Sequence, residues 1–143
     1  MKQFLLFTLA AASFAASPVE PVNHDRSGIA IKGYDPVAYF KQSMPVKGKA
    51  ELAFEWMGAK WLFVNNEDRN QFVSAPEKFA PQYGGYCAWA VSKGSTASID
   101  PEVWKIIEGK LYLNYSKDIQ HKWEKDVGQR IAEANRNWPG LHK

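Results

Sequence analysis

Two aromatic hairpin patterns, each followed by a capped helix, constrain the fold of this chain more than any other feature. In the first, "FEWMGAKWLFV", Phe54 and Trp56 precede a turn at Met57-Gly58-Ala59, and Trp61 and Phe63 follow it. Aromatic residues at alternate positions on both sides of a glycine turn are typical of a β-hairpin. The stretch therefore predicts two short antiparallel strands.

A helix is predicted directly after this hairpin. Asn65 or Asn66 can cap its first turn, where the acidic Glu67 and Asp68 are favourable. The helix should stop before Pro76, because the residue before a proline avoids the helical conformation.

The same order recurs near the C-terminus. "WKIIEGKLYLNY" predicts a second hairpin with its turn at Glu108-Gly109, and Ser116 is the expected cap of one long helix that ends near Trp138-Pro139-Gly140. An apolar residue recurs every four positions in that helix, which predicts a stripe facing the core: Ile119, Trp123, Val127 and Ile131. The two units, at about residues 52–75 and 103–137, predict an α+β fold with short antiparallel hairpins packed beside helices.

The first residues, "MKQFLLFTLAAASFAASPVEP", are typical of a secretory signal. One lysine precedes an apolar run, and small residues precede a cut after Ala15. A membrane anchor needs about 20 apolar residues, and this run is shorter. We expect a signal peptide at residues 1–15 and no stable membrane anchor once it is removed.

The rest of the chain is expected to form one domain. The segment "ASPVEPVNHDRS", residues 16–27, has two prolines and no periodicity, which predicts an extended arm or tether. The domain itself should cover residues 28–139, with a short tail at residues 140–143. Alternating Ile29 and Ile31 predict a short strand at its start. Lys and Arg number 18 against 15 Asp and Glu, without a basic block, so the charge pattern indicates no nucleic-acid partner.

The single cysteine, Cys87, lies in "QYGGYCAWA" and leaves several interpretations open. It can be a small buried packing residue, since cysteine is among the most buried residue types. It can also be a thiolate activated at a helix start, with His121 as the base of a thiol-dependent enzyme. A third interpretation is the wall of a pocket for a small organic ligand or cofactor. Aromatic residues with polar tips gather in the neighbouring sequence and suit such a pocket: Tyr34, Tyr39, Tyr86 and Trp89.

The fourth interpretation is a soft-metal site. Copper(I) accepts sulfur ligands and low coordination numbers, so a single thiolate can serve as one of its few ligands. Asp35, Tyr83 and His121 are the candidate oxygen and imidazole donors that would join Cys87. A structural zinc site needs four ligands, mostly cysteine or histidine, and the stretch from residue 33 to residue 90 has no histidine.

Three stretches of the chain resemble the exported single-domain branch of the YHS family, which is related to TRASH-type, treble-clef-like domains. They are "GYDPVAYF", "PEKFAPQYGGYCA" and "WKIIEGKLYLNYSKDIQHKWEKDV". The resemblance implies a metal-associated module, because YHS domains accompany copper-transporting ATPases, metal sensors and some oxygenases. It also implies the bacterial periplasm as the compartment. Family members with a plausible metal site carry a cysteine just after Asp-Pro-Val, where this chain has Ala38.

The expected function is therefore an exported, non-enzymatic binding module for copper or another soft metal, with Cys87 at its centre. The alternative is a small thiol-dependent or cofactor-binding enzyme centred on the same residue. The sequence names no protein partner.

Overall fold

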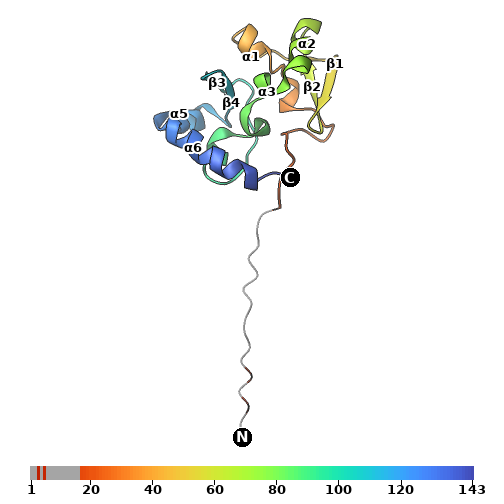
Figure 1. Ribbon diagram of the computed structural model, residues 1–143. Coiled ribbons are helices and arrows are strands. Elements are labelled where there is room, and N and C mark those ends of the chain that lie inside the picture. Colours follow the sequence, from red (N-terminus) through yellow and green to blue (C-terminus); the bar gives the residue numbers. More distant parts are fainter. Residues whose placement is uncertain (1–2, 4, 6–16) are drawn as a thin grey trace.

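The structure is a computed structural model that describes residues 3, 5 and 17–143. The predicted signal peptide lies almost entirely outside these residues. Among the described residues, none of the helices combines the length and the apolar character needed to cross a membrane. The described chain is α+β: helices lie beside two separate antiparallel hairpins of two strands each, as the sequence predicts (Figure 1).

The first hairpin and the helix after it form as predicted, and a second, short helix that was not predicted follows at residue 76. Asn65 caps α2, its side-chain oxygen accepting a hydrogen bond from the Asp68 N–H at 2.7 Å. Proline at the first position of α3 fits the start of a helix, where its missing N–H has no partner to lose. The elements are β1 (Lys49–Trp56), β2 (Ala59–Phe63), α2 (Asn66–Ser74) and α3 (Pro76–Phe79).

The second hairpin also forms, but the long helix predicted after it is wrong. The helix is interrupted at Asp126, where φ is −133° and ψ is 51°, so two helices form in place of one. Aspartate here and glycine at position 128 are weak helix formers, and the break lets the second helix turn back to pack against α4 (Ala88–Ser92). The elements are β3 (Trp104–Ile107), β4 (Lys110–Leu113), α5 (Lys117–Lys125) and α6 (Val127–Asn137).

Short helical turns connect the two units. The strand predicted at Ile29 and Ile31 is replaced by isolated bridges, Ile29 to Lys60 and His24 to Ala30, and by a 3-10 turn. The remaining short elements are the 3-10 turns η1 (Ile31–Gly33), η2 (Gln82–Gly85) and η3 (Trp138–Gly140), and the helix α1 (Ala38–Lys41).

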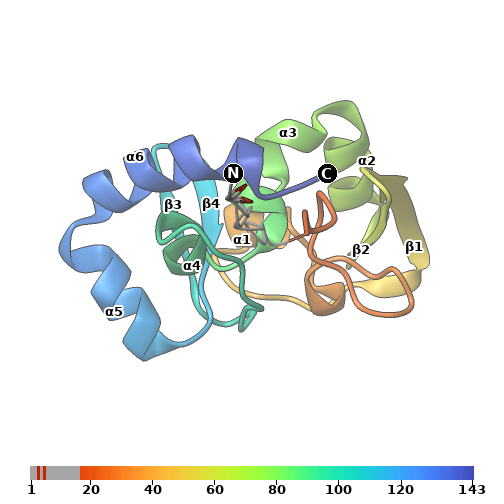
Figure 2. The ribbon, with the colours of Figure 1, turned by 90° about the horizontal axis from the view of Figure 1, so that it is seen from below.

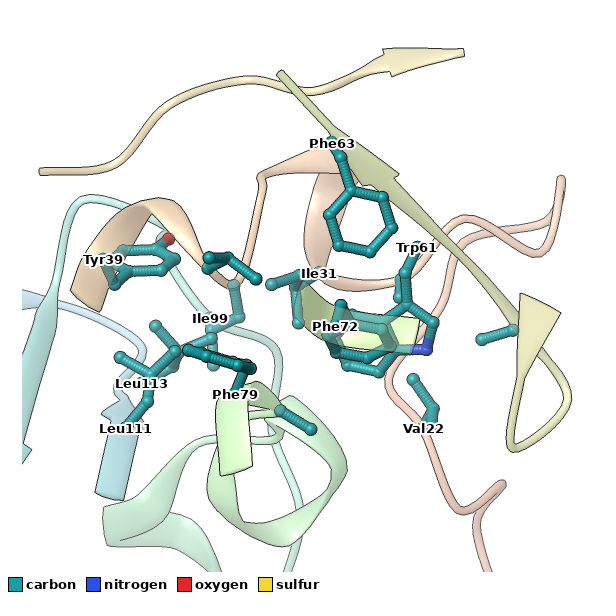
Figure 3. Packing of buried hydrophobic residues seen from close by; sticks show 14 of the residues in the cluster. Val22, Ile31, Tyr39, Trp61, Phe63, Phe72, Phe79, Ile99, Leu111 and Leu113 are labelled. Atoms are coloured by element: carbon teal, nitrogen blue, oxygen red, sulfur yellow. The ribbon is translucent and has the colours of Figure 1, made fainter. Parts of the chain in front are cut away.

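A buried apolar cluster joins the two units. Seen from below, β1, β2, α2 and α3 lie at one end of the molecule and β3, β4, α5 and α6 at the other, with α1 between them (Figure 2). Phe72 of α2 packs against Trp61 and Phe63 of β2, each with ring centroids 5.2 Å apart (Figure 3). Leu111 and Leu113 of β4 belong to the same buried cluster. The second hairpin therefore stabilises the first through shared apolar burial.

The described part of the N-terminal arm, residues 17–27, packs against the domain and is not a loose tether. Val22 exposes 2% of its surface, and the Asn23 N–H donates to the Gly84 carbonyl at 2.8 Å. Val19 forms a parallel bridge with His142, so the arm also holds the C-terminal tail. The prolines prevent a helix here without preventing burial.

Candidate functional site

Cys87 lies where η2 meets α4, at a sharp reversal of the backbone. Three consecutive residues have left-handed backbone angles: φ is 59° at Tyr83, 61° at Gly84 and 82° at Gly85. Glycine adopts this conformation without the cost that a side chain adds, which explains the glycine pair. Cys87 then occupies the position just before α4, and its N–H donates to the Ala97 carbonyl at 3.0 Å.

The thiol of Cys87 is buried and hydrogen-bonded to an amide. The residue exposes 1% of its surface, and its Sγ lies 3.5 Å from Oδ1 of Asn114. The same oxygen accepts the Trp89 N–H at 3.0 Å. Because an oxygen must accept the backbone N–H, Nδ2 is the free end of the amide, and it has no hydrogen-bond partner within the described structure although it is buried. The NH2 group of Asn114 is thus a buried donor without a partner among the described residues.

A hollow of about 200 Å³ adjoins this thiol. Its walls come from four parts of the chain: Cys87, Trp89 and Ala90 at α4, Ala97 from the loop after it, Tyr115 following β4, and Ile119 of α5. Tyr115 is 58% exposed, so the hollow opens to solvent on its side. We call this space the Cys87 pocket.

Two basic side chains lie over the indole of Trp89. The Lys93 ammonium is 4.6 Å and the Arg130 guanidinium carbon 5.2 Å from the ring centroid. Arg130 also pairs with Glu133 at 3.0 Å. Cation–π contacts of this kind contribute about 0.5–1 kcal/mol at exposed sites, and they hold the Trp89 ring in one orientation.

The predicted metal donors take up other roles. Asp35 is fully buried, and its oxygens accept backbone N–H groups from Val37, Ala38 and Val64. The Tyr83 hydroxyl donates to Oδ1 of Asn135 at 3.0 Å. His121 lies exposed on α5. Across the described residues, no group of three or more His, Cys, Asp or Glu side chains is arranged to hold a metal ion.

The predicted pocket aromatics are dispersed as well. The Tyr39 hydroxyl donates to the Pro101 carbonyl at 2.7 Å, and burial raises the pKa of this phenol. The Tyr86 hydroxyl donates to the Glu20 carbonyl at 3.1 Å, and Tyr34 forms a backbone bridge with Lys47. Trp89 is the member of the predicted set that lines the Cys87 pocket.

Asn114 is the site residue that sequence reasoning missed. It directly follows the apolar strand β4, and it is fully buried. A polar residue at the end of an aromatic strand was the available signal, but the position alone does not say whether its side chain turns toward solvent. Its proximity to Cys87 depends on a pairing across 27 residues.

Comparison with known proteins adds no relative to this description: no family model, curated protein or solved structure matches the chain.

Proposed function

We propose that this chain is a non-enzymatic binding module whose ligand lies in the Cys87 pocket. The observation that supports the proposal most is the open hollow of about 200 Å³ that Cys87 and the side chains of Trp89, Ala90, Ala97, Tyr115 and Ile119 line. A cavity of about 150 Å³ with apolar walls accommodates a benzene ring. A small apolar molecule of one or two rings suits the space.

The surroundings of the thiol support binding rather than catalysis. A nucleophilic cysteine needs a neighbouring base that removes its proton. The hydrogen bond of Cys87 goes instead to the Asn114 amide, which does not take up a proton at neutral pH. His121, the base that the enzyme alternative requires, is exposed on α5.

A soft metal ion is the second ligand class, and it rests on the YHS resemblance and on the sulfur of Cys87. Next to the thiol the structure offers an amide oxygen rather than a second sulfur or imidazole. This donor set does not fit a closed four-ligand site. It leaves copper(I) at low coordination as the metal to test, since that ion prefers sulfur ligands. Export to the bacterial periplasm belongs to the same proposal and rests on the leader and the resemblance.

Calorimetric titration with indole tests the proposal. Ala97→Leu places a larger side chain at the wall of the Cys87 pocket and should abolish indole binding, whereas Ala132→Leu on the exposed face of α6 should leave it unchanged. Equal indole binding by Ala97→Leu and Ala132→Leu would show that the ligand does not bind in the Cys87 pocket.

Copper(I) forms the second arm of the same experiment. Under anaerobic conditions, copper uptake should be lost in Cys87→Ala while indole binding persists. Equal copper uptake by the unmodified chain and by Cys87→Ala excludes a metal role for the thiol.

A further inference from the structure

Two carboxyl groups meet inside the fold, at the junction between α1 and the first hairpin unit. Asp35 lies between η1 and α1 and exposes 0% of its surface, and Asp68 lies in the first turn of α2 and exposes 3%. Asp68 is the neighbouring acid of Asp35, and its carboxyl is placed to share a hydrogen bond with that of Asp35 once a proton is present. Burying even one carboxylate without a cation is unfavourable, so burying two needs an explanation.

Backbone amides already occupy both oxygens of Asp35. Oδ1 accepts the N–H groups of Val37 at 2.8 Å and Ala38 at 3.2 Å. Oδ2 accepts the N–H of Val64 at 2.9 Å. One carboxyl group therefore ties the start of α1 to the end of β2.

The second acid has an oxygen with no protein donor. Oδ2 of Asp68 is buried and receives no N–H or O–H within the described structure. An ionised carboxylate only accepts hydrogen bonds, so two such groups cannot bond to each other. A shared proton would let the two buried acids hydrogen-bond to each other and would give the unpartnered Oδ2 of Asp68 a role.

The other charged groups near this junction do not neutralise the two acids. Arg69, next to Asp68, donates from Nε to the Ala53 carbonyl at 3.1 Å and lies over the Phe54 ring. The Tyr39 phenol faces Asp35 but donates to the Pro101 carbonyl. The remaining charged side chains of these segments are exposed: Lys41, Lys47, Lys60 and Glu67.

We propose that Asp35 and Asp68 form a buried proton-binding site that fastens α1 to α2, and that loss of the shared proton loosens this junction. The inference is independent of the Cys87 pocket.

The stability of the folded chain should depend on pH because the Asp35–Asp68 pair holds a proton. Burial and the neighbouring Asp68 raise the pKa of the Asp35 carboxyl from 3.8 to about 7. The folded chain thus holds a proton that the unfolded chain releases, so stability is highest below about pH 4 and falls as the pH rises toward 7. Between pH 5 and pH 8 this site should lower the folding equilibrium constant about a hundredfold.

The test compares urea unfolding of the full chain at several values between pH 5 and pH 8. Asp68→Asn places a permanent N–H donor beside Asp35, so the decrease of about a hundredfold should shrink to a few-fold. Glu67→Gln removes an exposed charge from the same helical turn and should keep the full decrease. A decrease of equal size in Asp68→Asn and Glu67→Gln would overturn the proposal.

A carboxyl carbon NMR titration of the unmodified chain covers the case in which Asp68→Asn does not fold. The expected result is an aspartate signal that titrates near pH 7 and disappears from that range in Asp35→Asn or Asp68→Asn, whichever folds. If every aspartate of the folded, unmodified chain titrates below about pH 5, the shared proton does not exist.

Discussion

Replacing Gly84 with alanine tests whether the N-terminal arm is a packed part of the domain. A Cβ at this position would lie 1.9 Å from the Pro21 carbonyl oxygen and 2.9 Å from its carbon. Both atoms belong to the backbone of the arm, so no rotation of a side chain relieves the overlap. The arm has to move away from η2.

The cost follows from what the arm would lose. Two hydrogen bonds join Asn23 to the loop, one from its N–H to the Gly84 carbonyl and one from Nδ2 to the Gly85 carbonyl at 3.1 Å. Each contributes about 1 kcal/mol, and exposing the side chain of Val22 costs about 1.5 kcal/mol more. The left-handed backbone at Gly84, with φ of 61°, adds about 1 kcal/mol for any residue with a Cβ. Gly84→Ala should therefore lower the free energy of unfolding by about 4 kcal/mol.

Gly58→Ala is the matched control. Its φ is 76°, so it carries the same kind of backbone cost, but a Cβ there has nothing within 4 Å. It should cost about 1 kcal/mol. Urea unfolding followed by circular dichroism gives both values, and hydrogen exchange at the Asn23 amide should accelerate only in Gly84→Ala. If the two variants lose equal stability, the arm is not packed as described.

Two further predictions concern stability. Tyr39→Phe removes the hydroxyl that donates to the Pro101 carbonyl and should lower the free energy of unfolding by about 1 kcal/mol in urea, whereas Tyr115→Phe at an exposed position should change it little. Gly128→Ala, within α6 and with nothing within 4 Å of the added Cβ, should raise the melting temperature through a gain of about 0.5–1 kcal/mol. A loss of stability there would mean that α6 is not helical at this position.

Local signals in the sequence predicted both hairpins and the N-terminal caps of the helices that follow them correctly. Glycine turns and Asn65 act within a few residues, so nothing distant can override them easily. The continuous helix over residues 117–137 was a wrong prediction, because an apolar spacing of four continues across the break at Asp126. Asp126 and Gly128 are weak helix formers and favoured an interruption. The interruption is what forms, and it lets α6 pack against α4.

The site was harder to predict because it depends on contacts between distant segments. Asp68 has the sequence context of a solvated acid in a first helical turn, and its burial against Asp35 joins positions 33 residues apart. The sequence singles out Cys87 as the position to examine, and Trp89 lines the same pocket. The alternation of a strand does not show which way the residue after it turns, so Asn114 could not be placed beside the thiol from sequence.

The most direct test of the account is the position at which a small apolar ligand binds. Amide NMR spectra of the chain titrated with indole should show saturable shifts at Cys87, Trp89 and Ala90, and these shifts should be absent in Ala97→Leu. Shifts confined to other parts of the molecule, or shifts that persist unchanged in Ala97→Leu, would contradict the assignment of the Cys87 pocket as the binding site.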